Sequence, residues 1–283
     1  MYAQIARQIP ARIRRKAGAH WHVCSRQAGA AGSERCGKLS QAPIMVGSGL
    51  MEGNIFALVM ANPHNSFGHD VISVGLTQVR AIVDLFQSAK PIDTKTFPHV
   101  MDALYPVKDY VQVAANLNKF FAAALNGQTF TAVNATATQL ALGDILFTCS
   151  ALVTSSVIAK FAASRNSYLY LFNHTPSNAA LSLLGPTHTS EMPFLFGTFD
   201  AYAAEITHGA SPEWTPTAME QTMSQSIMDY WLNFARYLDP NGATNGANAK
   251  SNAVKWPAAG CGAENNFMVF GDKGPGACCG GWC

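Results

Sequence analysis

The apolar positions of residues 43–283 form short continuous runs and longer stretches with a helical repeat. Apolar runs without alternation are typical of strands that are covered on both faces of a sheet. Three such runs predict strands, at Ile44–Gly47, Tyr168–Phe172 and Phe267–Phe270. Helical spacing predicts five helices, at Thr77–Ser88, Lys95–Tyr105, Val111–Leu125, Ile145–Ala163 and Thr217–Leu238. Few strands separated by long helices predict an α/β fold with a mainly parallel sheet flanked by helices.

The helix predicted at Thr217–Leu238 has the clearest amphipathic pattern of the chain. Its apolar stripe consists of Met219, Met223, Ile227, Tyr230, Trp231, Phe234 and Leu238. The Asp239–Gly242 segment, which reads Asp-Pro-Asn-Gly, is predicted to end the helix, and a Gly/Asn-rich loop follows to Asn252.

Residues 1–42 differ in composition from the rest of the chain and are predicted to be a basic, disordered leader. The first 40 residues hold eight of the 19 Lys and Arg residues and one of the 17 acids, and they contain no apolar stretch of the kind found in secretory signal peptides. A transit peptide is the alternative, although Pro10 and Gly18 would interrupt its amphipathic helix. The spacing of His20, His22, Cys24 and Cys36 matches no compact zinc module, so no metal site is expected.

The composition of the remaining body, residues 43–283, restricts the classes of protein that the chain can represent. With 48% hydrophobic residues and a net charge of +2, the chain can bury enough surface to fold. The part after residue 40 holds 11 basic and 16 acidic residues, which disfavours nucleic-acid binding. Because Asn, Gly, Thr or Pro interrupts every long uncharged stretch, no integral membrane segment is expected.

Three segments of the body resemble a known family. Ile44–Phe56 contains a Glu-Gly pair after a strand, Gly185–Gly197 contains His-x-x-Glu and ends in Phe-Gly, and Met228–Gly242 contains Trp-x-x-Phe-Ala and ends in Asp-Pro-Asn-Gly. In this order, they resemble the C-terminal portion of the type-B carboxylesterase/lipase family, the cholinesterase-like branch of the α/β-hydrolases. The resemblance implies that residues 43–283 form the C-terminal part of an α/β-hydrolase, with an incomplete, mainly parallel sheet.

The resemblance also implies a chemistry. The family hydrolyses carboxylic esters, from small-molecule to lipid-like ones, by a Ser-Glu-His mechanism without a metal or an organic cofactor. Glu52 would be the acid that orients the histidine, His188 would be the base, and Glu191 would be a buried support near the active-site loop. The order of acid before histidine agrees with that of the fold.

The serine nucleophile of such a mechanism lies in a Gly-x-Ser-x-Gly turn, and the 283 residues contain no such motif. Neither Ser48 nor Ser211 has the required glycine spacing, and the family's Gly-rich oxyanion-hole segment is also absent. We therefore predict that this chain alone is a non-competent fragment of an esterase. The alternatives are a non-catalytic cholinesterase-like interaction protein, and complementation by a separate chain that carries the nucleophile. A protein partner would then cover the sheet edge that the strand at Ile44–Gly47 leaves exposed.

Cysteines and sequons add further expectations. The resemblance implies a disulfide between Cys149 and Cys261, and two buried thiols are the alternative. Pairing of the other five cysteines cannot be assigned, and the tail that holds three of them is predicted to be flexible; the five are Cys24, Cys36, Cys278, Cys279 and Cys283. Asn134 and Asn173 begin Asn-x-Thr sequons, which matter only if the chain is secreted. The family is usually secreted, but the N-terminus resembles no signal peptide, which leaves the compartment open.

Overall fold

The computed structural model describes residues 42–56, 111–122, 139–140, 143–161, 166–243, 254–259 and 266–278. Four strands lie within these ranges: β1 (Ile44–Gly49), β2 (Ser167–Asn173), β3 (Phe267–Gly271) and β4 (Gly274–Cys278). The longer helices are α5 (Val111–Phe120), α7 (Cys149–Phe161), α9 (Phe199–Ile206) and α10 (Ala218–Tyr237). The short helices are α8 (Met192–Phe196), the 3-10 turns η1 (Glu52–Phe56) and η4 (Leu181–Leu183), and the π-helical turn η3 (Asp144–Thr148).

The four described strands form one sheet in the order β1-β2-β3-β4. The β1–β2 and β2–β3 pairs are parallel, and the β3–β4 pair is an antiparallel hairpin. Parallel neighbours need a crossover connection, and the helices between the strands provide it. This mixed sheet with flanking helices confirms the predicted α/β-hydrolase class.

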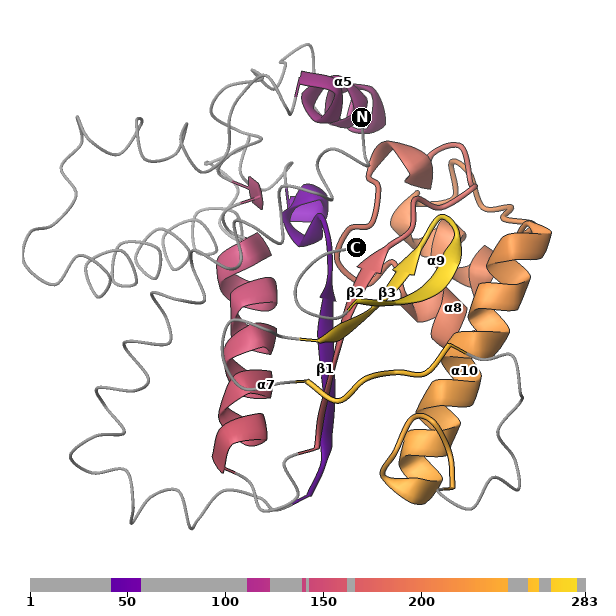
Figure 1. Ribbon diagram of the computed structural model, residues 1–283. Coiled ribbons are helices and arrows are strands. Elements are labelled where there is room, and N and C mark those ends of the chain that lie inside the picture. Colours follow the sequence, from indigo (N-terminus) through magenta and orange to yellow (C-terminus); the bar gives the residue numbers. More distant parts are fainter. Residues whose placement is uncertain are drawn as a thin grey trace, which may run out of the picture.

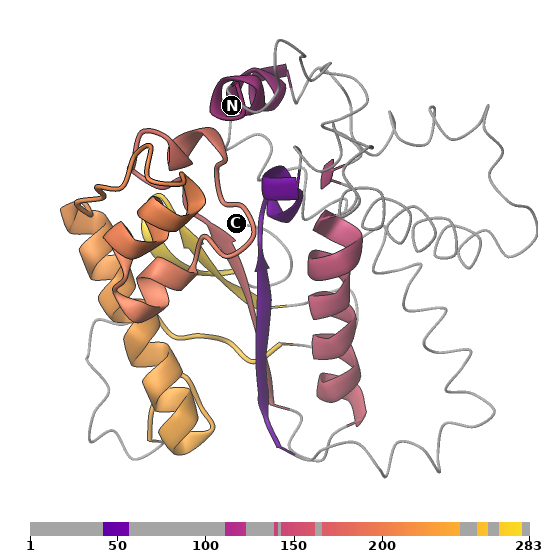
Figure 2. The ribbon, with the colours of Figure 1, turned by 180° about the vertical axis from the view of Figure 1, so that it is seen from behind.

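Helices cover both faces of the sheet. In Figures 1 and 2, α7 lies on one side of β1 and β2, while α8, α9 and α10 lie on the other. The side chains of β2 alternate between the two layers: Leu169 packs with Leu152 of α7, and Phe172 packs with Ile227 of α10. Burial on both faces explains why the strands are continuous apolar runs rather than alternating ones.

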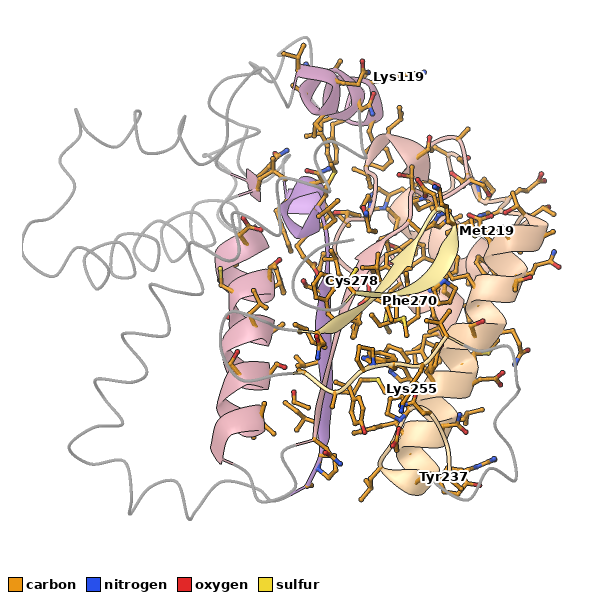
Figure 3. All side chains as sticks on the ribbon, in the orientation of Figure 1. Lys119, Met219, Tyr237, Lys255, Phe270 and Cys278 are labelled. Atoms are coloured by element: carbon orange, nitrogen blue, oxygen red, sulfur yellow. The ribbon has the colours of Figure 1, made fainter. Side chains whose placement is uncertain are left out.

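The larger core fills the space between the sheet and α10 (Figure 3). Trp256 is almost fully buried there, and its ring meets Tyr230 of α10 edge-on at 5.3 Å and Phe270 of β3 at 5.5 Å. Edge-to-face aromatic pairs of this kind add stability beyond the area that they bury. The apolar stripe predicted on the helix therefore faces the sheet, and it fixes α10 against β2 and β3.

The ends of α10 agree with the prediction. Thr217 is the N-cap, and it exchanges hydrogen bonds with Glu220 in a capping box. Leu238 is the C-cap, with a left-handed φ of 59°, and Asp239–Gly242 follows. Leu238, the last residue of the predicted apolar stripe, is an exception to its burial: the residue is 52% exposed, because the cap turns it away from the core.

Several other expectations can be compared with the structure. The predicted strands agree to within two residues at either end, and Val111–Leu125 is confirmed as helix over Val111–Phe120. The helix predicted at Ile145–Ala163 consists of η3 followed by α7. The helices predicted at Thr77–Ser88 and Lys95–Tyr105 lie outside the described residues, as do residues 1–41, so the leader at 1–42 and the body at 43–283 stay predictions.

The C-terminal tail was predicted to be flexible around Cys278, and this was wrong. Gly274–Cys278 forms β4, and Cys278 is fully buried at its end. Glycine and proline are uncommon inside strands, yet Pro275 is tolerated because β4 pairs only with β3 among the described strands. None of the described helices has both the length and the apolar character needed to cross a membrane.

Candidate active site

His188 and Glu52, which the sequence predicts to work together, are hydrogen-bonded in the structure. Glu52 begins η1, directly after β1, and His188 lies in the loop between η4 and α8. His188 Nδ1 lies 2.7 Å from Glu52 Oε2. Because β1 and β2 are parallel neighbours, the segments that follow their carboxyl ends lie at the same edge of the sheet. This topology brings together two residues that are 136 positions apart.

The Glu52 carboxylate is held rigidly below the histidine. Its side chain is 5% exposed, and its second oxygen, Oε1, accepts a hydrogen bond from the Gly49 amide at 2.5 Å. A Cβ atom on Gly49 would lie 2.8 Å from the Pro186 carbonyl oxygen, so the close approach of the two loops requires glycine there. A buried carboxylate with both oxygens engaged can orient the imidazole and stabilise it once it is protonated.

Direct hydrogen bonds join the acid turn to the histidine loop. The Met51 amide donates to the Pro186 carbonyl at 2.9 Å, and the Ile55 amide donates to Thr187 Oγ1 at 3.0 Å. The Asn54 side chain donates to the Leu184 carbonyl at 2.7 Å. These bonds fix the spacing of the two loops independently of the Glu52–His188 contact.

Thr189, the residue after His188, has a strained backbone. Its φ is 70°, in the left-handed region, which is uncommon for a β-branched residue and costs about 1–3 kcal/mol. Its hydroxyl donates to the His188 carbonyl at 2.6 Å and lies 3.2 Å from the Tyr202 hydroxyl. The surrounding structure therefore holds the histidine loop in one conformation.

The imidazole of His188 is partly covered by aromatic rings. The ring of Phe147 in η3 lies 4.3 Å from it and that of Phe56 in η1 lies 5.7 Å from it, centroid to centroid. The His188 side chain remains 36% exposed. With Glu52 accepting the proton of Nδ1, Nε2 is the ring nitrogen that can take up a proton. The hydrogen bond to Glu52 raises the pKa of His188 above its ordinary value, although partial burial opposes this.

Glu191 lies close enough to this pair to interact with both charges, and its supporting role stays a prediction. Burial raises the pKa of its carboxyl group, and the negative charge of Glu52 adds to the effect. The Tyr170 side chain lies close enough to act on the pKa of Glu191, while Glu191 Oε2 has no hydrogen-bond partner within the described part of the chain. Burial and the charge of Glu52 therefore both oppose ionisation of the Glu191 carboxyl group.

The two serines in glycine-containing contexts lie in other surroundings. Ser48 is buried in β1 and donates to Thr148 Oγ1 at 3.3 Å. Ser211 lies after α9, where its hydroxyl accepts a hydrogen bond from Asn178 at 3.3 Å. In the ranges that the structure describes, no group of three or more His, Cys, Asp and Glu side chains could hold a metal ion.

The remaining predicted sites are described only in part. Cys149 is buried at the start of α7, and Cys261 lies outside the described residues, so their pairing stays a prediction. Cys278 is disulfide-bonded. Asn173 is half-buried at the end of β2, and its glycosylation is untested. Five more predicted positions lie outside the described residues: Cys24, Cys36, Asn134, Cys279 and Cys283.

Comparison with known proteins identifies the family. The profile of the carboxylesterase family matches residues 30–275, most of the chain. The chain belongs to the carboxylesterase family. This carboxylesterase-family chain is 27% identical to the cholinesterase of Mus musculus over 222 residues, which cover 78% of the chain and 30% of that relative.

Shorter matches show higher identity. The acetylcholinesterase of Danio rerio is 36% identical over 91 residues, which cover 32% of the chain and 12% of that relative. The acylcarnitine hydrolase of Rattus norvegicus is 35% identical over 104 residues, which cover 35% of the chain and 16% of that relative. The chain thus spans no more than about a third of the length of these relatives, and the resemblance found in its three segments is confirmed.

Sequence reasoning found the carboxylate, the histidine and Glu191 but missed the residues that hold them. Phe147 and Phe56 carry no motif, and only the fold shows that they cover the imidazole. Thr187 and Thr189 flank His188 within Gly185–Gly197. A hydroxyl next to the histidine is only a weak sign that these threonines help to hold its loop. A left-handed threonine cannot be recognised from sequence, because threonine rarely adopts that conformation.

Proposed function

We propose that this chain supplies the acid and the base of a carboxylic-ester hydrolase that works by a Ser-Glu-His mechanism. The hydrogen bond of 2.7 Å between His188 Nδ1 and Glu52 Oε2, at the carboxyl ends of two parallel strands, carries the proposal. Family membership supports ester hydrolysis, and the geometry supports these two residues as the pair that moves the proton.

In the proposed reaction, His188 Nε2 removes the proton of a serine hydroxyl as the serine oxygen attacks the ester carbonyl carbon. The imidazolium that forms is stabilised by the Glu52 carboxylate, which stays ionised. His188 then donates the proton to the departing alkoxide, which leaves as the alcohol. Water deacylates the serine ester by the same proton transfers, releases the acid and restores the serine. The 283 residues contain no Gly-x-Ser-x-Gly motif, so the serine is proposed to come from polypeptide outside them.

The substrate is proposed to be a small-molecule or lipid-like ester. The rings of Phe147 and Phe56 lie beside the imidazole of His188 and favour an apolar group on at least one side of the ester bond. Relatives of this chain include a bile salt-activated lipase of Bos taurus and an acylcarnitine hydrolase of Rattus norvegicus, whose names fit esters with apolar groups.

The test compares ester hydrolysis by the 283-residue chain alone with hydrolysis by the same chain co-expressed with a nucleophile-bearing polypeptide. We expect the chain alone to hydrolyse short-chain and long-chain nitrophenyl esters no faster than buffer, because losing the nucleophile costs about 10⁶ in kcat. Co-expression with the nucleophile-bearing part of a carboxylesterase should restore turnover, and His188→Gln should abolish it. Hydrolysis by the chain alone that His188→Gln removes would contradict the expected inactivity and point to another nucleophile in the chain. Restored turnover that survives His188→Gln would sink the proposal.

A non-catalytic interaction protein is the second candidate. The missing nucleophile motif favours it, together with the finding that β1 pairs only with β2 among the described strands. An unpaired strand edge is able to pair with another polypeptide. A stable complex with the nucleophile-bearing part that showed no ester hydrolysis would favour this candidate over the first.

A further inference from the structure

A second histidine, His174, lies in a cluster of charged groups that the proposed reaction does not use. It follows β2, and its side chain is 5% exposed. Its Nε2 lies 3.0 Å from Glu220 Oε1, and its Nδ1 lies 2.8 Å from Asp272 Oδ1. Both nitrogens of a buried imidazole thus face carboxylate oxygens.

The hydrogen bonds determine the protonation state of this imidazole. An ionised carboxylate only accepts hydrogen bonds, so both ring nitrogens must donate, and only the imidazolium carries two N–H groups. Glu220 is ionised: burial alone would raise the pKa of its carboxyl group, but hydrogen bonds from His174 and Ser177 and from backbone amides lower it to about 2. For His174, burial alone would lower the pKa, but the two carboxylates outweigh it and raise the pKa above the ordinary value.

This cluster does not have the properties of a second hydrolytic site. The Ser177 hydroxyl donates to Glu220 Oε2 at 2.6 Å and accepts a hydrogen bond from the Trp214 indole at 3.0 Å. A carboxylate whose pKa is about 2 is a weak base, and an imidazolium has no lone pair with which to take a proton. His174 is therefore a structural cation rather than a proton carrier.

The cation joins three elements that are distant in the sequence. His174 directly follows β2, Glu220 lies in the first turn of α10, and Asp272 lies in the turn between β3 and β4. Glu220 is fully buried, whereas the Asp272 side chain is 61% exposed. Among the described residues, two apolar rings also lie beside the imidazole: Phe194 of α8, edge-on at 5.4 Å, and Phe172 of β2 at 6.3 Å. Glu220 and Asp272 are thus the charged groups that act on it.

The cluster is connected to the proposed active site through α8. The Ser224 hydroxyl of α10 donates to the Phe194 carbonyl at 2.7 Å, and the Phe194 ring packs against His174. Glu191, the N-cap residue of α8, closes the loop that carries His188. The position of α10 therefore fixes the helix that follows the histidine loop.

We propose that His174 is a pH-sensitive clamp, whose cationic ring holds the turn between β3 and β4 and the first turn of α10 against the end of β2. When the ring loses a proton, one nitrogen becomes an acceptor that faces a carboxylate, and the two repel. Buried Glu220 keeps its bonds to Ser177 and Thr217, so exposed Asp272 is the partner that turns to water. Opening thus starts at the β3–β4 turn.

The direction of the pH dependence follows from the pKa of each group. A histidine whose pKa is raised in the folded chain contributes stability that is complete below about 6.5 and is lost as the pH rises through the folded-state pKa. For Glu220, the stability is present above about 4.3 and is lost as the pH falls towards 2. The clamp is therefore fully formed between about pH 4.3 and 6.5.

The first test is an NMR titration of His174 in the full chain, with the resonance assigned by comparison with His174→Gln. We expect a pKa above about 6.5, a decrease in Asp272→Asn, and no change in Glu205→Gln, a control in which an exposed acid that has no side-chain contact with the cluster is neutralised. A pKa at or below 6.5, or a value that Asp272→Asn leaves unchanged, would overturn the proposal.

The second test measures unfolding by urea as a function of pH. Above pH 6.5, the ratio of folded to unfolded chain should fall more steeply in wild type than in His174→Gln, by about tenfold per pH unit until the folded-state pKa is reached. Over the same range, hydrogen-exchange protection factors should decrease in Gly274–Cys278 before they decrease in α7. Equal slopes, or a simultaneous loss of protection, would contradict the clamp. If His174→Gln does not fold, the His174 resonance is assigned by through-bond NMR experiments on the wild-type chain, and the wild-type titration decides alone. Neither test depends on ester hydrolysis.

Discussion

His188 and His174 both lie between β2 and α10 in the chain, and each is hydrogen-bonded to a buried glutamate, but the number of carboxylates at the ring differs. His188 has one carboxylate, Glu52 at Nδ1, and its side chain is 36% exposed. His174 has two, one at each nitrogen, and its side chain is 5% exposed. One partner orients the ring and leaves Nε2 to exchange a proton, whereas a second partner occupies that nitrogen and fixes the ring as a cation.

This difference shows that a raised pKa does not by itself identify a catalytic histidine. The pKa of both imidazoles is raised by carboxylate hydrogen bonds against the effect of burial. The two histidines differ in whether Nε2 is free of a carboxylate partner among the described residues and in the groups that lie beside the ring. His188 has partial exposure and aromatic cover, whereas His174 is enclosed by Phe194, Phe172 and its two acids.

The largest expected effect on stability is at the enclosed cluster, which consists of His174, Glu220 and Asp272. Glu220→Ala should lower the free energy of unfolding by about 3–5 kcal/mol near pH 6, because it leaves a buried imidazolium without its buried partner. The amide of Ser177 and the N-cap residue Thr217 would lose their acceptor as well. Urea unfolding measures this loss.

Glu205→Gln is the matched control for Glu220→Ala, because Glu205 is an exposed acid on a neighbouring helix. It should change the free energy of unfolding by less than about 0.5 kcal/mol. A loss in Glu220→Ala below about 1 kcal/mol would mean that His174 simply gives up its proton, and that the two histidines differ less than their geometry indicates.

A smaller effect on stability is expected at the open pair, which consists of Glu52 and His188. Glu52→Gln keeps the size of the side chain but removes its charge, and it should lower the free energy of unfolding by about 1–3 kcal/mol. The cost is smaller than at Glu220, because the partly exposed ring of His188 can turn to water. The pKa of His188 should fall towards its ordinary value, which an NMR titration measures. An unchanged His188 pKa would contradict the hydrogen bond as the cause of its shift.

The open pair could be predicted from sequence, and the enclosed cluster could not. Glu52 and His188 lie in segments whose residue order resembles a family pattern, and parallel pairing of β1 and β2 brings the two segments together. His174 lies in the sequon Asn173-His-Thr, which predicts a glycosylation site at the asparagine and gives no role to the histidine. Its acids come from a helix N-terminus and a hairpin turn, and no local spacing relates the three.

Elements whose own residues carry a pattern were predicted correctly. A strand that forms only because a neighbouring strand pairs with it was not. The stripe on α10 has a helical repeat and β2 is a continuous apolar run, so each element carries its signal within its own residues, and both were confirmed. β4, with the sequence Gly-Pro-Gly-Ala-Cys, has no strand propensity of its own. It is a strand because β3 offers it a pairing edge and because Asp272, in the turn, binds His174.

The smallest expected effect concerns the rings that cover the open histidine. Phe147→Leu keeps an apolar side chain in η3 but removes the ring that lies 4.3 Å from His188, and it should lower the free energy of unfolding by about 0.5–1.5 kcal/mol. Since burial lowers the pKa of His188, greater exposure should raise it further, as an NMR titration would show.

Phe56→Leu is the matched control for Phe147→Leu, since the Phe56 ring lies farther away, at 5.7 Å, and should shift the His188 pKa less. The pKa of His174 should stay constant in both variants, because Phe194 and Phe172 are the rings that enclose it. A shift of both histidines in Phe147→Leu would mean that the two clusters move together. The two histidines would then belong to one coupled region behind the histidine loop, instead of acting separately as the proposed proton carrier and the proposed fixed cation.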